Sequence, residues 1–228
     1  MSKNYKFFSE KEFRTSMLSK FSQVSIFATI LATSFAVNAA ESTRNRFALP
    51  EIKQTITVDG VLDENVWQSA GKMTLNYENN PGEGTPAPVK TELFFYQDGT
   101  SLNVAFKAYD PDPKQIRASL RDRDALWPDD NVGLIIDTFN DERGGYEFFV
   151  NPLGAQADMK MDDTNGWDED ASWDAIWDSA GQITDFGYVV EMSIPFSSLR
   201  FPETEGEQIW NIAGWRNYPR DVRTNMAT

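Results

Sequence analysis

The chain has 228 residues, of which 35 are Asp or Glu and 21 are Lys or Arg, so its formal net charge is −14. This charge repels phosphate groups, and it therefore excludes nucleic acid and anionic lipid as partners. The sequence has no His and no Cys, which removes the commonest general base, the commonest metal ligand and every thiol nucleophile. Neutral polysaccharide and divalent cations remain compatible with this composition.

Residues 1–40 are predicted to be a secretory signal peptide. The first 20 residues carry five basic side chains, a mostly apolar run follows over residues 21–37, and the small residues Ala39 and Ala40 end the segment. A transmembrane anchor is the alternative, but this run is shorter than the roughly 20 residues that span a bilayer. We expect an exported protein, periplasmic or associated with the outer membrane, whose mature charge is −17.

Residues 41–52 are polar and predict a linker, and residues 53–228 predict one all-β domain of short alternating runs separated by turn residues. The clearest signal is a hairpin over residues 89–108, with its turn at 97–100. Further strands are expected at 132–137, 146–151, 155–161, 176–184, 188–194 and 208–215, with a long loop over 162–174. The predicted fold is an antiparallel β-sandwich with short helical elements. Because no closing strand is evident before Thr228, we expect the domain to be truncated at its C-terminus.

Three motifs, in this order, resemble carbohydrate-binding module family 9. They are VDGVLDENVW at 58–67, WPDDNVGLIID at 127–137 followed by FVN at 149–151, and GYVVEMSIPF at 187–196. Together they span most of the predicted domain. The resemblance implies a non-catalytic sandwich of the kind attached to xylanases and other polysaccharide-degrading enzymes, with carbohydrate as its partner.

Two other segments, FFVNPLG at 148–154 and YPRD at 218–221, look closer to a bacterial family of unknown function. In that family a family-9-like domain precedes a predicted outer-membrane barrel. This resemblance implies an alternative function: a structural or interaction head domain that contacts its own barrel or a partner protein and binds no free sugar.

Trp127 stands in a polar loop before an expected strand, where the resemblance places one of two tryptophans that clamp a sugar. An indole ring can stack on the apolar C–H face of a pyranose. The alternative is a rim residue that packs over the sandwich. Asn151 matches a family asparagine that hydrogen-bonds sugar, although a turn-forming Asn before Pro152 is an equal interpretation. Glu147 lies on the same strand face as Phe149 and is a further candidate.

The chain departs from the family pattern at two polar positions. Gly133 replaces a sugar-binding glutamate, and Phe149 replaces an arginine. The second clamp tryptophan of the family lies beyond the last matched strand, so Trp167 and Trp173 are the candidates for its role. Trp215 stands in a strand and is expected to lie in the core.

Eight acidic residues and the single Lys160 stand between residues 158 and 178, and such a density predicts a calcium site or, equally, a solvated acidic loop. The resemblance favours calcium, which family-9 modules carry. The candidate ligands are Asp162, Asp163, Asp168 and Asp170. An EF-hand does not fit, because with Gly166 at the glycine position its first and last ligands would be Met161 and Ser172.

No pair of carboxylates stands out as a glycosidase acid and base, so no enzymatic activity is expected. No haem is expected either: Met159, Met161 or Met192 could supply one axial ligand, but the chain has no His for the other side. No nucleotide cofactor is expected. The sequence thus predicts a carbohydrate-binding module without chemistry of its own.

Overall fold

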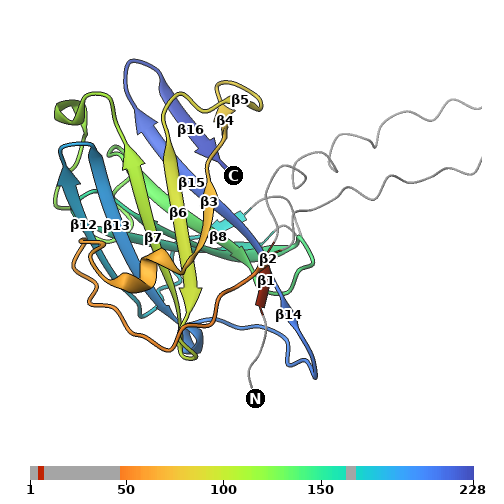
Figure 1. Ribbon diagram of the computed structural model, residues 1–228. Helices are drawn as coiled ribbons and strands as arrows, with labels where there is room; N and C mark the ends of the chain where they lie inside the picture. The colour runs from red at the N-terminus through yellow and green to blue at the C-terminus, as the bar shows by residue number, and fades with distance from the viewer. Residues whose placement is uncertain (1–4, 8–46, 163–167) are drawn as a thin grey trace, which may run out of the picture.

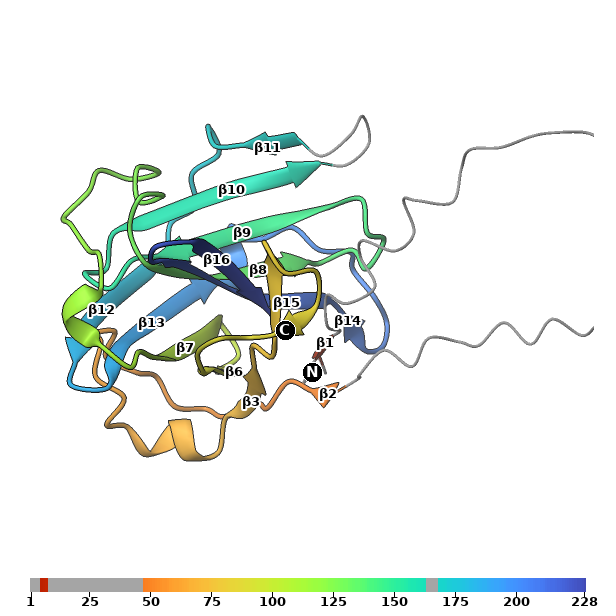
Figure 2. The same ribbon diagram turned by 90° about the horizontal axis from the view of Figure 1, so that it is seen from above.

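Two antiparallel sheets stack face to face in the computed structural model, which describes residues 5–7, 47–162 and 168–228 (Figure 1). The first sheet has eight strands in the order β11-β10-β9-β8-β15-β16-β4-β5. Its strands are β4 (Tyr77–Asn80), β5 (Thr85–Pro86), β8 (Asn131–Asp137), β9 (Gly144–Val150), β10 (Gln156–Asp162), β11 (Asp168–Asp170), β15 (Asn211–Pro219) and β16 (Arg223–Ala227). In Figure 2 this sheet is the upper of the two layers of the sandwich.

The second sheet has five strands in the order β12-β13-β7-β6-β3. Its strands are β3 (Gly71–Thr74), β6 (Thr91–Gln97), β7 (Ser101–Tyr109), β12 (Asp178–Thr184) and β13 (Gly187–Pro195). The described helical segments are short 3-10 turns: η3 (Asn65–Gln68), η4 (Pro113–Gln115) and η5 (Phe196–Ser198). The predicted fold class, an antiparallel β-sandwich, is confirmed, and its short helical elements are these turns.

A small third sheet joins β14 (Gln208–Ile209), β1 (Tyr5–Phe7) and β2 (Phe47–Ala48). β1 pairs in parallel with β14 and antiparallel with β2. This first strand falls inside the predicted signal peptide, whose cleavage stays a prediction. None of the described residues belongs to a helix long and apolar enough to cross a membrane.

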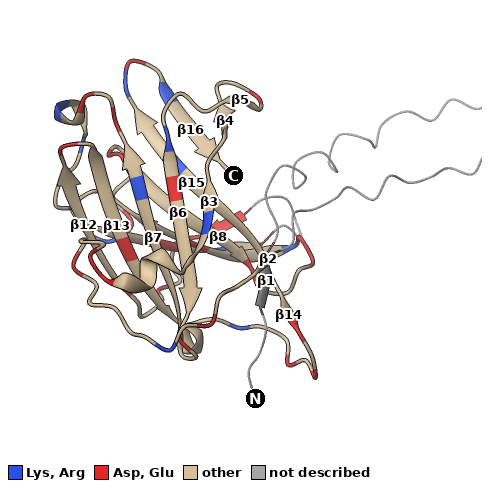
Figure 3. Ribbon diagram, in the orientation of Figure 1, with Lys and Arg blue, Asp and Glu red and all other residues tan. Residues whose placement is uncertain are grey.

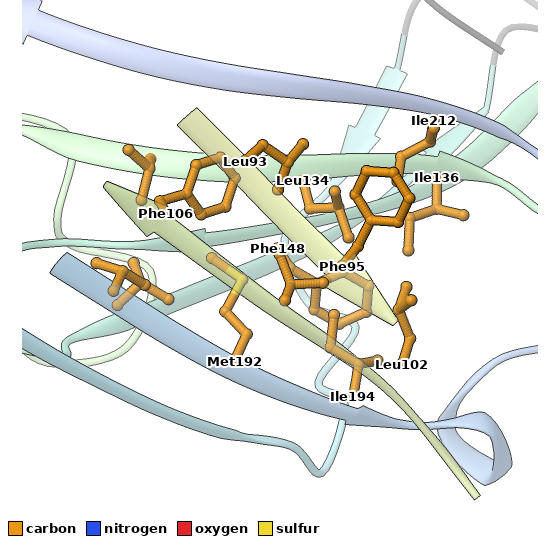
Figure 4. Packing of buried hydrophobic residues seen from close by; sticks show 14 of the residues in the cluster. Leu93, Phe95, Leu102, Phe106, Leu134, Ile136, Phe148, Met192, Ile194 and Ile212 are labelled. Atoms are coloured by element: carbon orange, nitrogen blue, oxygen red, sulfur yellow. The ribbon is translucent and has the colours of Figure 1, made fainter. Parts of the chain in front are cut away.

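Strand alternation builds the core between the two large sheets. In β8 the side chains of Val132, Leu134 and Ile136 are fully buried and face the second sheet, as the alternation of side chains along a strand predicts. They meet inward-facing residues of β6, β7 and β13, several of which are drawn in Figure 4. Burial of each such side chain contributes about 1.5–3 kcal/mol to the hydrophobic driving force.

Residues 52–70 cross the outer face of the five-stranded sheet, as the orange segment of Figure 1 shows. There Trp67 packs edge-on against Tyr96, with the ring centroids 5.4 Å apart. Beside them the buried carboxylate of Glu191 accepts hydrogen bonds from the Trp67 indole and from the backbone N–H groups of Asp59 and Gly60. Charged residues also lie on β6, β7 and β13 of this sheet (Figure 3).

Three segments differ from the sequence-based expectation. Residues 47–52 of the predicted linker belong to the packed domain, because Leu49 is buried in the core and Ile52 donates its N–H to the Gln97 carbonyl at 2.9 Å. A strand not expected from the sequence follows β15: β16 pairs with β15 and β4, while truncation of the domain stays a prediction. Part of the predicted loop at 162–174 is β11, which pairs with β10.

Candidate functional site

Trp127 lies at the surface directly before β8, and its side chain is 37% exposed. Its ring meets the ring of Phe149 edge-on, with the centroids 5.2 Å apart. Phe149 in turn lies over Gly133, its cross-strand partner on β8. A Cβ atom at Gly133 would stand 2.2 Å from Cδ1 of Phe149, so the missing side chain makes room for the ring that supports Trp127.

Asp129 fixes the loop that carries Trp127. Its carboxylate accepts two hydrogen bonds from the Arg121 guanidinium, at 3.0 and 3.1 Å, and one from the backbone N–H of Ser119. Its backbone carbonyl accepts from the side-chain amides of Asn131 and Asn217 on the two adjacent strands. Hydrogen bonds of Asp129 therefore link the loop both to residues 119–121 and to the strands of the sheet.

Asp130, the next residue, forms a second anchor. Its buried carboxylate accepts from both terminal nitrogens of Arg220, at 2.9 and 3.0 Å, and from the backbone N–H of Arg117. Arg220 also pairs with buried Asp110 and lies over the ring of Tyr218 at 4.1 Å. A bidentate arginine–carboxylate pair is among the strongest polar contacts in proteins, so the base of the loop is rigidly held.

The two aspartates differ in their electrostatics. Burial acts to raise the pKa of Asp129, but the hydrogen bonds from Arg121, Asn151 and Ser119 hold it below its usual value. Asp130 is more deeply buried, and desolvation raises its pKa despite the pairing with Arg220. Both carboxylates are fully engaged in holding the loop.

Asn151 belongs to the same framework. Its side-chain nitrogen donates to the Ser119 carbonyl and to Asp129, at 2.8 and 3.0 Å, and its oxygen accepts from the N–H groups of Leu153 and Ala155. These bonds use the whole hydrogen-bonding capacity of the amide, and the residue is 0% exposed. The structure thus shows the turn-forming asparagine of the alternative interpretation, with no free group to offer a sugar.

Glu147 lies on the outer face of β9, two residues from Phe149, and is 3% exposed. Trp215 also lies on this face, because it is the cross-strand partner of Gly133 and packs beside Phe149. The expectation of a core position for Trp215 is therefore wrong. The neighbouring Arg216 takes the inward position, where its guanidinium donates to Thr91 and to two backbone carbonyls.

Trp173 does not form a clamp with Trp127. Its ring packs against Tyr146 and Phe148, at 5.0 and 6.1 Å between centroids, and both of these residues face the core. The eight-stranded sheet therefore separates Trp173 from the Trp127 surface. Trp167, the other candidate, lies outside the described residues.

Three of the candidate calcium ligands, Asp162, Asp168 and Asp170, lie on the paired strands β10 and β11. Asp162 and Asp168 are cross-strand partners, whereas Asp170 pairs across from Lys160 and accepts hydrogen bonds from Ser172. Asp163 lies outside the described residues. Over the segments that the structure describes, no three carboxylates gather at one place, and calcium binding stays a prediction.

The sequence profile of the family described as carbohydrate family 9 binding domain-like matches residues 58–212. The chain belongs to this family. A search of curated protein sequences gave no match. The match covers β3 to β14 and the start of β15, so it includes the Trp127 loop and the strands beneath it.

Solved structures share the fold of this family 9-like domain at low sequence identity. A Bacteroides uniformis protein to which carbohydrate binding has been ascribed aligns with a TM-score of 0.60 and 10% identity, over 78% of this chain and 87% of its own. A family 9 module from Caldicellulosiruptor kristjanssonii, solved with glucose, aligns with a TM-score of 0.53 and 16% identity, over 78% and 83% of the chains. The same kind of module solved with cellotriose gives 0.50 and 15%, over 78% and 82%.

Proposed function

We propose that this chain is a non-catalytic carbohydrate-binding module that holds sugar on the outer face of its eight-stranded sheet, with the Trp127 indole as the stacking surface. The observation that carries the proposal is the setting of Trp127: an exposed indole, supported edge-on by Phe149, on a loop anchored by two buried aspartates. A ring held in place before binding loses little conformational entropy when it stacks on a sugar.

The proposal differs from the family pattern in its polar half. Gly133 and Phe149 stand where the resemblance predicts a glutamate and an arginine, and Asn151 is committed to the loop. The half-buried amide of Asn225 on the neighbouring strand β16 would then supply hydrogen bonds to hydroxyl groups. Export through the predicted signal peptide would place such a module where polysaccharides occur.

Calorimetric titration with glucose and with cellotriose tests the proposal. We expect Trp127→Ala to weaken binding at least about tenfold, which corresponds to about 1.4 kcal/mol. Phe139→Ala is the matched control, because Phe139 is also an exposed aromatic residue but follows β8 at the opposite end of that strand. Equal affinities for wild type and Trp127→Ala would contradict the proposal.

The alternative function, a head domain that contacts a partner protein, is favoured by one observation. Leu120 and Leu153 are exposed at 88% and 40% on the two loops that Asn151 joins. A folded protein that binds none of the neutral sugars tested would support this alternative. Binding that depends on Trp127 would oppose it.

A further inference from the structure

Residues 52–70 form a strap that lies across the outer face of the five-stranded sheet (Figure 1). Glu191 on β13 joins the strap to this sheet. Its Oε2 accepts hydrogen bonds from the backbone N–H groups of Asp59 and Gly60, at 3.1 and 2.9 Å, and its Oε1 accepts from the Trp67 indole at 3.2 Å. All three donors belong to the strap, so the strength of this junction depends on the state of one carboxyl group.

The junction is closed off from water. Glu191 is 0% exposed, and Trp67 packs beside it with Tyr96 and Ala105, which are also 0% exposed. The Tyr96 hydroxyl donates to the Gln54 carbonyl of the strap at 2.8 Å. A charge in such a place loses its hydration, so the fold favours the neutral form of the carboxyl unless a cation lies next to it.

The sheet supplies no such cation. Among the described residues, Lys and Arg form ion pairs with other carboxylates and none with Glu191. Lys107 on β7 and Asp178 on β12 share its face of the sheet, each two residues along its strand from a cross-strand partner of Glu191. The Lys107 ammonium lies over the Phe94 ring, 5.7 Å from its centroid. Tyr96 on β6 is neutral, because burial raises the pKa of its hydroxyl far above the usual value.

The strap brings two acidic side chains to Glu191. Burial is the main cause that raises the pKa of the Glu191 carboxyl to about 7. The hydrogen bonds from the N–H groups of Gly60 and Asp59 act against this shift, whereas the negative charges of Glu64 and Asp59 add to it. Closing the strap therefore places acidic groups next to one another.

Glu64 has a buried oxygen that lacks a donor. It is the N-cap residue of η3, but its side chain makes no capping hydrogen bond. Its Oε1 accepts from the backbone N–H of Thr57 at 3.0 Å, and its Oε2 is buried without a partner. In the strap, all of which the structure describes, no other buried side-chain oxygen is left in this state. Such an oxygen is costly to bury unless a proton donor reaches it.

The hydrogen bonds of Glu191 fit a protonated carboxyl group. Oε2, with two N–H donors, has the bonding of a carbonyl oxygen, which offers two lone pairs. Oε1 is then the hydroxyl oxygen, which can accept from the Trp67 indole and still donate one hydrogen bond. Oε2 of Glu64 is an acceptor for that bond.

We propose that Glu191 is protonated while the strap is closed and donates this proton to Oε2 of Glu64, and that loss of the proton to solvent loosens the strap. Ionised Glu191 would lie among the charges of Asp59 and Glu64 with no cation to balance them. Because the closed strap raises the pKa of Glu191 from 4.5 to about 7, the strap is held fully below pH 4.5 and is released as the pH rises through 7. This device lies on the other sheet from Trp127 and does not depend on the proposed function.

Hydrogen exchange of the full chain at pH 5, 6.5 and 8, corrected for intrinsic exchange rates, tests the proposal. The reporters are the N–H groups of Gly60, Trp67 and Ala70, each of which is hydrogen-bonded in the closed strap. We expect their protection to fall at least about tenfold from pH 5 to pH 8. They should also be less protected than the N–H groups of β8 at every pH, because the strap opens while the sandwich stays folded.

Three variants assign the effect. Glu191→Gln is expected to abolish the fall in protection, and Glu64→Gln, which removes the charge of the acceptor but keeps its shape, is expected to reduce it several-fold. Asp63→Asn is the matched control, because it removes one negative charge at the next position of the strap from an exposed side chain, and it should keep the full effect. If Glu191→Gln fails to fold, Glu64→Gln and its control decide the question.

Four results would each overturn the proposal. The first is protection of the strap that does not fall between pH 5 and pH 8, and the second is a fall that Glu64→Gln leaves unchanged. The third is an equal reduction of the fall in Asp63→Asn and Glu64→Gln. The fourth is equal protection of the strap and of β8, which would mean that the strap opens only when the whole domain unfolds.

Discussion

Gly133 shows how one residue sets the shape of the candidate site. Because it has no side chain, the Phe149 ring can lie over β8 and support Trp127. We expect Gly133→Ala to push this ring aside and to lower the free energy of unfolding by about 1–3 kcal/mol, the usual cost of overpacking. Urea unfolding followed by tryptophan fluorescence measures the change. An unaltered midpoint would show that the ring does not depend on the glycine.

Glu191 predicts a dependence of stability on pH. Burial raises its pKa from the usual 4.5 to about 7, so the folded state favours the protonated form. The stabilisation is fully present below pH 4.5 and is lost as the pH rises through 7, by about 3 kcal/mol in total. Unfolding free energies measured from pH 4.5 to 8 should therefore decrease more in the wild type than in Glu191→Gln. If the unfolding free energies of the two proteins changed in parallel with pH, Glu191 would not have a raised pKa in the folded state.

Residue-level prediction from sequence was right about the exposure of Trp127, wrong about that of Trp215, and failed for hydrogen bonding. The position of Trp127, in a polar loop before a strand, was enough to place its indole at the surface. The residues next to Asn151 in the sequence do not reveal that its side-chain nitrogen donates hydrogen bonds to Ser119 and Asp129, because these partners lie 32 and 22 residues away. Long-range partners of this kind are invisible to motif and spacing.

The loop that carries Trp127 depends on arginines from other elements. Arg220 follows β15 and neutralises Asp110 and Asp130, whose side chains are almost fully buried. We expect Arg220→Ala to cost about 3–5 kcal/mol of stability, because it leaves two buried carboxylates without a counter-charge. Thermal or urea unfolding checks this value.

Arg121→Ala is the matched comparison, since it removes a more exposed guanidinium from Asp129. Its pair is partly screened by solvent, so we expect a smaller loss of stability, about 1 kcal/mol. The variant should nevertheless weaken sugar binding by loosening the Trp127 loop. An equal loss of stability in the two variants would contradict the ranking of the two anchors.

Strand alternation predicted some elements well and others poorly. In β8 the expected division of faces is the observed one, because successive side chains of a strand point to opposite faces and Val132, Leu134 and Ile136 take the inner one. In β15 a tryptophan faces outward and the adjacent Arg216 faces inward, where Tyr188 and Tyr218 flank its guanidinium. Hydrophobicity alone assigns this pair the opposite way. β16 was missed because RTNMA has no clear period.

At the scale of the whole molecule, the outer faces of the two sheets differ. Residues 52–70 cover that of the five-stranded sheet and bury Trp67 there. The eight-stranded sheet has Trp127 and Trp215 at its outer face. The sandwich class and the family followed from the order of the motifs, but the assignment of a binding surface to one sheet needed the strand pairing.

Nuclear magnetic resonance of the indole Nε1–H groups, recorded while cellotriose is added, tests the central claim most directly. The account predicts that the resonances of Trp127 and Trp215 shift in a saturable way. Those of Trp67, Trp177 and Trp210, which are at most 6% exposed, should stay in place. A saturating titration in which neither Trp127 nor Trp215 moves, or in which only the buried indoles respond, would contradict it.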